Sequence, residues 1–84
     1  MKHAGAATLL RLAPLLQTLR ELPGLIERTP GSFYRRSRAC LHFHEHGEQV
    51  FADVRIDGPE FTRVDVSDAA AQARLLTDLR RRLP

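Results

Sequence analysis

The sequence predicts an α+β fold, a two-layer sandwich in which an antiparallel meander of about four strands is covered on one face by N- and C-terminal helices. Three observations predict it. Leucines recur at helical spacing near both ends of the chain, apolar and polar residues alternate through the middle, and Gly, Pro, Asp and Ser separate the alternating runs. With 84 residues we expect a single domain, residues 1–84, in which residues 1–7 are flexible.

The first helix is expected over residues 8–22, where leucine fills most of the apolar positions. Pro14 lies inside this pattern. Either the helix begins there, with proline in its first turn, or an earlier helical segment is kinked. The dipeptide Pro23-Gly24 then ends the helix.

Four strands are expected to follow a short extended piece at 25–29, over residues 32–35, 38–45, 49–56 and 60–66. A turn through His46-Gly47 sets Phe43 opposite Val50. A loop at 57–59 sets Val54 opposite Thr62. This register gives the sheet one apolar face, which the helices can cover, and one polar face, where we expect any function of the sheet to reside.

The closing helix is expected to begin at Ser67 as N-cap, with Asp68 in the first turn, where a negative charge complements the helix dipole. Its apolar stripe runs to the end of the chain through Ala69, Ala73, Leu76, Leu79 and Leu83.

Composition sets limits on function. The single cysteine, Cys40, excludes an internal disulfide and a cysteine-paired zinc site and fits a cytoplasmic location. No apolar segment is long enough to span a bilayer, so no membrane partner is expected. The net charge of +3 and pI of about 10.0 favour anionic partners such as nucleic acids, although GC-rich coding alone also produces an arginine-rich chain.

Histidines occupy every second position at His42, His44 and His46, so strand alternation places them on one face. Imidazoles at i and i+2 are close enough to bind one zinc or other transition-metal ion. His42 and His44 are the expected pair. The candidates for a third ligand are Asp53 above all, Glu48 and Cys40. The alternative is that these histidines bind no metal, lie on an exposed face and disfavour pairing of the sheet edge with a strand of another molecule.

The same polar face of the predicted sheet is also a candidate surface for two other kinds of partner. Phe51 and Phe61, with Arg55 and Arg63 beside them, form an interaction face for a protein partner or a second copy of the chain. Single-stranded nucleic acid is the other candidate, because residues 33–38 combine aromatic and basic side chains that Arg55, Phe61 and Arg63 extend. Acidic residues interrupt that basic surface, and no nucleic-acid-binding signature accompanies it.

No complete catalytic constellation is present. A thiolate–imidazole dyad of Cys40 and His42 would need an orienting group and an oxyanion hole, and the sequence indicates neither. A buried apolar role for the cysteine is the alternative. We therefore expect a protein that is not an enzyme.

The order of elements, with Leu22-Pro23-Gly24 after the first helix and Arg38-Ala39 before the alternating hairpin, resembles small bacterial domains of the MmcQ/YjbR type. The His-x-His segment is similar to an uncharacterised luciferase-associated domain. The first resemblance implies a sheet packed on helices and a nucleic-acid or protein-interaction role, and neither implies a site residue. The expected function is thus a small bacterial interaction module, with metal binding through His42 and His44, or nucleic-acid binding, as alternatives.

Overall fold

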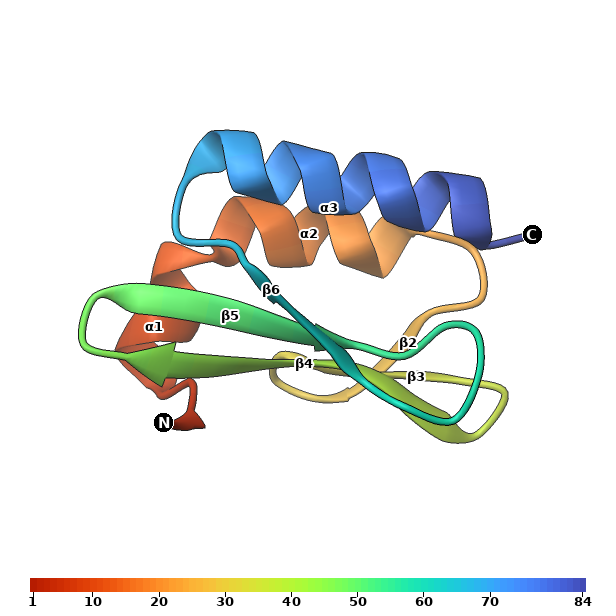
Figure 1. The fold of residues 1–84 in the computed structure, drawn as a ribbon, viewed down its shortest axis with the longest axis horizontal. Helices are drawn as coiled ribbons and strands as arrows, with labels where there is room; N and C mark the ends of the chain where they lie inside the picture. The colour runs from red at the N-terminus through yellow and green to blue at the C-terminus, as the bar shows by residue number, and fades with distance from the viewer.

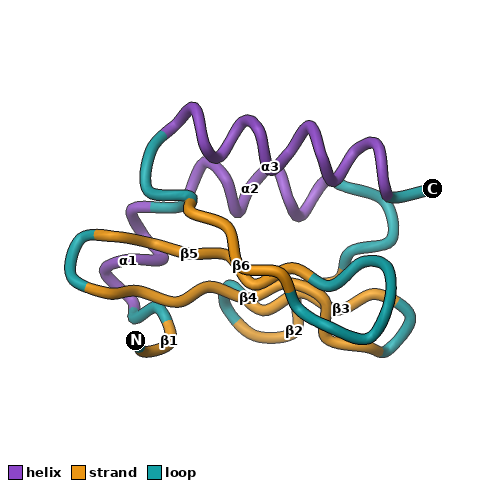
Figure 2. The backbone as a smooth tube through the Cα atoms, viewed as in Figure 1, coloured by secondary structure: helices purple, strands orange, loops and turns teal.

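Two helices cover one face of an antiparallel sheet in the computed structural model, which describes all of residues 1–84 (Figures 1 and 2). The sheet has the order β2-β3-β4-β5-β6, and β1 pairs with β4 on the same edge as β3. The elements are β1 (Lys2–His3), α1 (Ala6–Arg11), α2 (Ala13–Glu21), β2 (Ile26–Thr29), β3 (Ser32–Arg35), β4 (Arg38–His46), β5 (Gln49–Val54), β6 (Thr62–Asp65) and α3 (Ala69–Arg82). The predicted α+β class is confirmed, with two more short strands than expected.

The N-terminal helix is divided by Pro14. Helix α1 ends at Arg11, Leu12 lies between the helices with φ −88° and ψ 6°, and α2 carries Pro14 within its first two positions. Proline is tolerated there because the first N–H groups of a helix have no intrahelical acceptor. The break turns Leu12 into the core, where it is fully buried.

The core lies between the sheet and helices α2 and α3. Phe33, Leu41 and Phe43 project into it from the sheet, and Leu19 and Leu79 meet them from the helices. Burying these side chains contributes about 1.5–3 kcal/mol each to folding. None of the three helices is both long enough and apolar enough to cross a membrane.

The β4–β5 hairpin turns through Gly47-Glu48, one residue later than expected, so Phe43 pairs with Ala52 and not with Val50. The reason is local. Gly47 has φ +61° and takes the first of the two turn positions, which is where a two-residue hairpin of this kind requires glycine. The pairing moves by two residues, so every side chain keeps its predicted face. Between β5 and β6 the predicted pairing of Val54 with Thr62 is confirmed.

A bulge interrupts the β3–β4 pairing at Cys40. Tyr34 pairs with Ala39 and Phe33 with Leu41, so Cys40 is left without a partner on β3. Both Cys40 and Leu41 are therefore buried, although alternation predicts opposite faces for neighbours.

The closing helix differs from the prediction by one residue at its cap. Asp68 is the N-cap and its carboxylate accepts from the Ala71 N–H, while the Ser67 hydroxyl accepts from the Val50 N–H. The buried stripe of α3 is Ala71, Leu75 and Leu79, and only Leu79 of the expected stripe is fully buried. These three residues are four positions apart and so share one face of the helix, which is turned away from the face that the prediction chose.

The first residues of the chain, expected to be flexible, are paired with the sheet. Lys2 lies opposite Glu45 and His3 opposite His44, on the stretch of β4 that β3 does not reach. The Glu45 carboxylate accepts the Gly5 N–H at 2.7 Å and fixes the passage from β1 into α1.

Candidate metal centre on the outer face of the sheet

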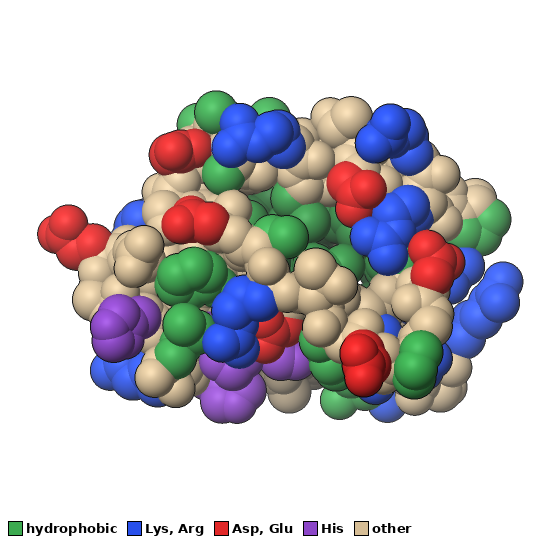
Figure 3. All heavy atoms as spheres, in the orientation of Figure 1, with side chains coloured by type: hydrophobic (Ala, Val, Ile, Leu, Met, Phe, Trp, Pro, Cys, Tyr) green, Lys and Arg blue, Asp and Glu red, His purple; other side chains and the backbone are tan.

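Three imidazoles converge on the face of the sheet opposite the helices. His42 and His44 project from β4, and the pairing of β1 with β4 brings His3 beside them. One ring nitrogen from each of the three lies within 4.8 Å of the others. Figure 3 shows histidine side chains gathered at the bottom of the molecule, next to acidic and basic ones. His46, two positions further along β4, is exposed and outside this group, which we call the histidine cluster (His3, His42 and His44).

The distances within the histidine cluster suit a metal ion. His42 Nδ1 lies 3.1 Å from His44 Nε2. Two nitrogens bound to one zinc ion at 2.0–2.1 Å in tetrahedral geometry are separated by roughly 3.3–3.4 Å. The ring centroids of His3 and His44 are 4.5 Å apart. The nitrogens that are up to 4.8 Å apart would have to approach one another to share an ion, and rotation of the rings about their side-chain bonds would bring them closer.

Asp53 lies directly against the histidine cluster on β5, across from His42 in the ladder. Its Oδ2 is 3.1 Å from His44 Nε2 and 3.9 Å from His42 Nδ1. Both of its oxygens also accept from Arg63 on β6, at 2.7 and 2.8 Å. The carboxylate predicted as a third ligand is therefore next to the site, on the same side as the two ring nitrogens that face each other. Its Oδ2 is placed to supply an oxygen to an ion there, although Arg63 neutralises its charge.

The protonation states favour metal binding at neutral pH. Burial lowers the pKa of His42 below its usual 6.5, although the charge of Asp53 opposes this effect. The hydrogen bonds from Arg63 lower the pKa of Asp53 below 3.8, against the effect of burial. His42 is thus neutral and Asp53 ionised near pH 7, and a neutral imidazole is the form that binds a metal.

Asp53 also makes folding sensitive to acid. Because its pKa is lower in the folded chain than in the unfolded one, its contribution to stability is complete above pH 3.8 and is lost as the pH falls through the folded pKa. We expect Asp53→Asn to lower the free energy of unfolding at pH 6, and the difference from wild type to shrink as the pH falls below 3.8, where Asp53 becomes protonated. Urea unfolding between pH 6 and pH 2 measures this difference. A difference in the free energy of unfolding that stays constant from pH 6 to pH 2 would contradict the lowered pKa of Asp53.

The predicted interaction face is largely occupied by contacts within the chain. The Arg55 guanidinium donates to the Ala39 carbonyl at 2.7 Å and lies 4.3 Å over the ring of Phe61. Phe61, 37% exposed, also contacts the His42 ring at 4.9 Å between centroids. Phe51 is half-buried on β5, and Arg63 is bound to Asp53. The parts of this face that stay exposed are on Phe61 and on Arg63, whose side chain is 45% exposed.

Cys40 does not join the histidine cluster. The bulge turns it into the core, where it is 2% exposed and its Sγ lies 3.5 Å from the Phe33 carbonyl. Burial raises the pKa of the thiol. The expected shared face of Cys40 and His42 is therefore wrong, and no thiolate–imidazole dyad forms. Glu48, another candidate ligand, lies in the exposed β4–β5 turn and outside the cluster.

The aromatic and basic run at residues 33–38 is divided between two environments. Phe33 is 1% exposed and belongs to the core, so it is not available to stack on a base. Tyr34 stacks with Arg28 of β2, whose guanidinium carbon lies 4.4 Å from the ring centroid. The arginines of this run lie at the end of the β3–β4 hairpin, away from the histidine cluster.

Sequence reasoning missed His3. It is separated from His44 by 41 positions, and the strand that carries it has only two residues, too few for a periodic pattern. The one available signal was chemical: His3 is the only histidine outside residues 42–46.

Comparisons of the chain with protein-family models, curated proteins and solved structures gave no match. The function of the histidine cluster is therefore inferred from its own side chains.

Proposed function

We propose that this chain is a transition-metal-binding module in which His3, His42 and His44 bind one divalent ion of the zinc class. The observation that carries the proposal is the convergence of three imidazoles from two paired strands, with donor nitrogens within 4.8 Å of one another. Three protein ligands with a position left for water or another ligand is a common arrangement at zinc.

The donor set also indicates the class of metal. Imidazole nitrogens suit zinc, copper, nickel and iron, whereas calcium and magnesium take oxygen ligands. No thiolate is within reach, since Cys40 is buried in the core. Asp53, held by Arg63, lies against the donor nitrogens of His42 and His44 and is the candidate for a fourth, oxygen ligand.

Binding of a metal would cross-link β1 to β4 through the side chains of the histidine cluster. His3 is exposed and belongs to the shortest strand, while His42 and His44 are part of the longest one. An ion that bridges them adds a link between segments distant in sequence, and it stabilises the folded chain by an amount that rises with the logarithm of metal affinity. Such a module needs no catalytic group, and interaction with a protein partner remains a separate prediction.

The test is zinc titration of the untagged, metal-stripped protein by isothermal calorimetry, with cobalt(II) absorption as a second readout. We expect one equivalent to bind at micromolar concentrations. His3→Gln changes only an exposed side chain and should weaken binding at least about 10-fold, the loss produced even by removing an outer hydrogen-bond partner of a ligand. His46→Gln is the matched control, because it removes an exposed histidine of β4 outside the cluster.

Two results would overturn the proposal. The first is the absence of stoichiometric binding at micromolar zinc. The second is an equal loss in His3→Gln and His46→Gln, which would indicate surface histidines that act independently of the cluster. His44→Gln, checked for folding by circular dichroism, supplies a second variant within the cluster.

A further inference from the structure

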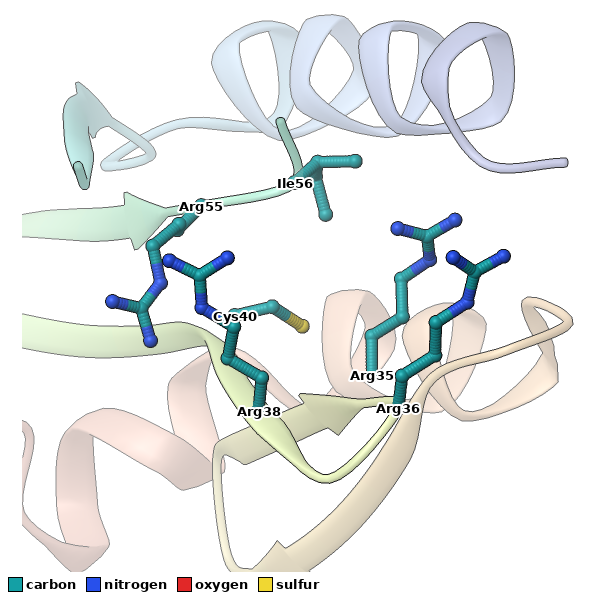
Figure 4. A pocket seen from close by; sticks show the side chains of 6 residues that line it. All are labelled: Arg35, Arg36, Arg38, Cys40, Arg55 and Ile56. Atoms are coloured by element: carbon teal, nitrogen blue, oxygen red, sulfur yellow. The ribbon is translucent and has the colours of Figure 1, made fainter. Parts of the chain in front are cut away.

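A cavity of about 220 Å³ lies where the β3–β4 hairpin meets the end of β5, at the opposite end of the sheet from β1 (Figure 4). Four of the six residues that line it are arginines, and no acidic residue does. The lining residues are Arg35, Arg36, Arg38, Cys40, Arg55 and Ile56. We call this the arginine cavity.

The charge of the arginine cavity is not neutralised within the chain. Arg35, Arg36 and Arg38 have no carboxylate within ion-pair distance, whereas Arg20, Arg63 and Arg82 each pair with one elsewhere in the molecule. Figure 4 shows Arg35 and Arg36 extending in the same direction from the hairpin. Like charges held together repel, and an anion between them removes that repulsion.

The fourth guanidinium is fixed in position. Arg55 donates from Nε and Nη2 to the Ala39 carbonyl, at 3.2 and 2.7 Å, and from Nη1 to the Pro59 carbonyl at 3.5 Å. These hydrogen bonds hold the positively charged guanidinium of Arg55 in one position at the side of the cavity. Cys40 and Ile56, 2% and 8% exposed, form the apolar floor of the cavity, while Arg36 and Arg38 at its mouth are exposed.

The backbone at the cavity is strained. Arg36 and Ser37, the two turn residues of the β3–β4 hairpin, have φ of +54° and +66°. Asn-Gly is the favoured pair for such a turn, because side chains other than those of Gly and Asn resist the left-handed conformation. Strained backbone of this kind is concentrated at functional sites, and this turn carries Arg36, whose side chain lines the cavity.

We propose that the arginine cavity binds the phosphate dianion of a small molecule, either inorganic phosphate or a phosphomonoester. Guanidinium groups bind phosphate oxygens through paired, charge-assisted hydrogen bonds, and three unpaired arginines together exceed the charge of one dianion. The volume of about 220 Å³ is large enough for a phosphate group and a small group attached to it. This site is separate from the histidine cluster and independent of metal binding.

The test measures phosphate binding to the metal-free protein at pH 7 by calorimetry and by thermal unfolding, with sodium chloride of equal ionic strength as the reference. We expect saturable binding of one phosphate, weakened at least 10-fold in Arg35→Gln/Arg38→Gln. Arg36→Gln, at an exposed turn position, gives a second variant with little risk to folding. Arg80→Gln/Arg81→Gln is the matched control, because these exposed arginines of α3 line no cavity.

A response that chloride reproduces, or an equal loss in the α3 control, would overturn the proposal. A nucleoside monophosphate and glycerol phosphate distinguish the source of the phosphate: tighter binding of either identifies a phosphomonoester, and equal or weaker binding identifies inorganic phosphate. Oligodeoxythymidine is the third arm. If it binds through the same arginines while phosphate does not, the ligand is a phosphodiester backbone and the proposal is wrong.

Discussion

Replacing Phe33 by alanine is expected to lower the free energy of unfolding by about 3–5 kcal/mol, the usual cost of truncating a buried phenylalanine. Phe33 is 1% exposed and belongs to the core between the sheet and the helices. A domain of 84 residues has a total stability of roughly 4–13 kcal/mol. The substitution should therefore remove between about a quarter and nearly all of the free energy of unfolding.

Urea unfolding followed by circular dichroism measures this loss, and Phe61→Ala is its matched control. Phe61 is 37% exposed on the outer face, where it contacts the ring of His42 and the guanidinium of Arg55. Phe61→Ala should lower the free energy of unfolding by about 1 kcal/mol, as expected for the loss of an aromatic and a cation–π contact at a partly exposed site. Equal losses in the two variants would show that Phe33 is not a core residue.

Replacing the turn Arg36-Ser37 by Asn-Gly is expected to raise the free energy of unfolding by about 1–2 kcal/mol. Both residues have positive φ, which costs roughly 1–2 kcal/mol for each residue other than glycine and less for asparagine. Glycine offsets part of the gain because it is more flexible in the unfolded chain. Thermal and urea unfolding of the double variant measure the effect.

Ser37→Ala is the control for this gain, since it keeps the Cβ atom that opposes the left-handed conformation. It should leave stability unchanged or lower it. A gain in Ser37→Ala as large as in the double variant would mean that backbone strain is not the cause. Because Arg36→Asn also removes one guanidinium from the arginine cavity, the double variant should fold more stably and bind phosphate less well, a trade-off typical of functional sites.

Most of the fold was predictable because its pattern is local. Leucine spacing and strand alternation give the helices and central strands within a few residues, and alternation gives the correct faces even where the β4–β5 register moves by two. The bulge at Cys40 was not predictable, because it depends on the register between β3 and β4. The alternation of apolar and polar residues along β4 does not indicate it. The cap at Asp68 was missed by one residue, since serine and aspartate are equally good N-caps.

The site was predictable only where its residues share one strand pair. His42 and His44 follow from alternation, and Asp53 follows from the pairing of β4 with β5, which a short turn imposes. His3 depends on a contact across 41 positions. The arginine cavity depends on the position of Arg55 relative to the hairpin, which the order of residues does not specify.

The short outer strands protect the rim of the sheet from self-association. The longest strand, β4, has β5 along one edge and β3 followed by β1 along the other. Only β1, β2 and β6, which have two to four residues each, lack a partner strand along one edge, and each of them carries charged side chains or a histidine. A short edge strand can form few hydrogen bonds with an incoming strand, and its charged side chains repel that strand or must be desolvated by it. Amyloid-like growth from the edges of this sheet is therefore disfavoured, even at high protein concentration.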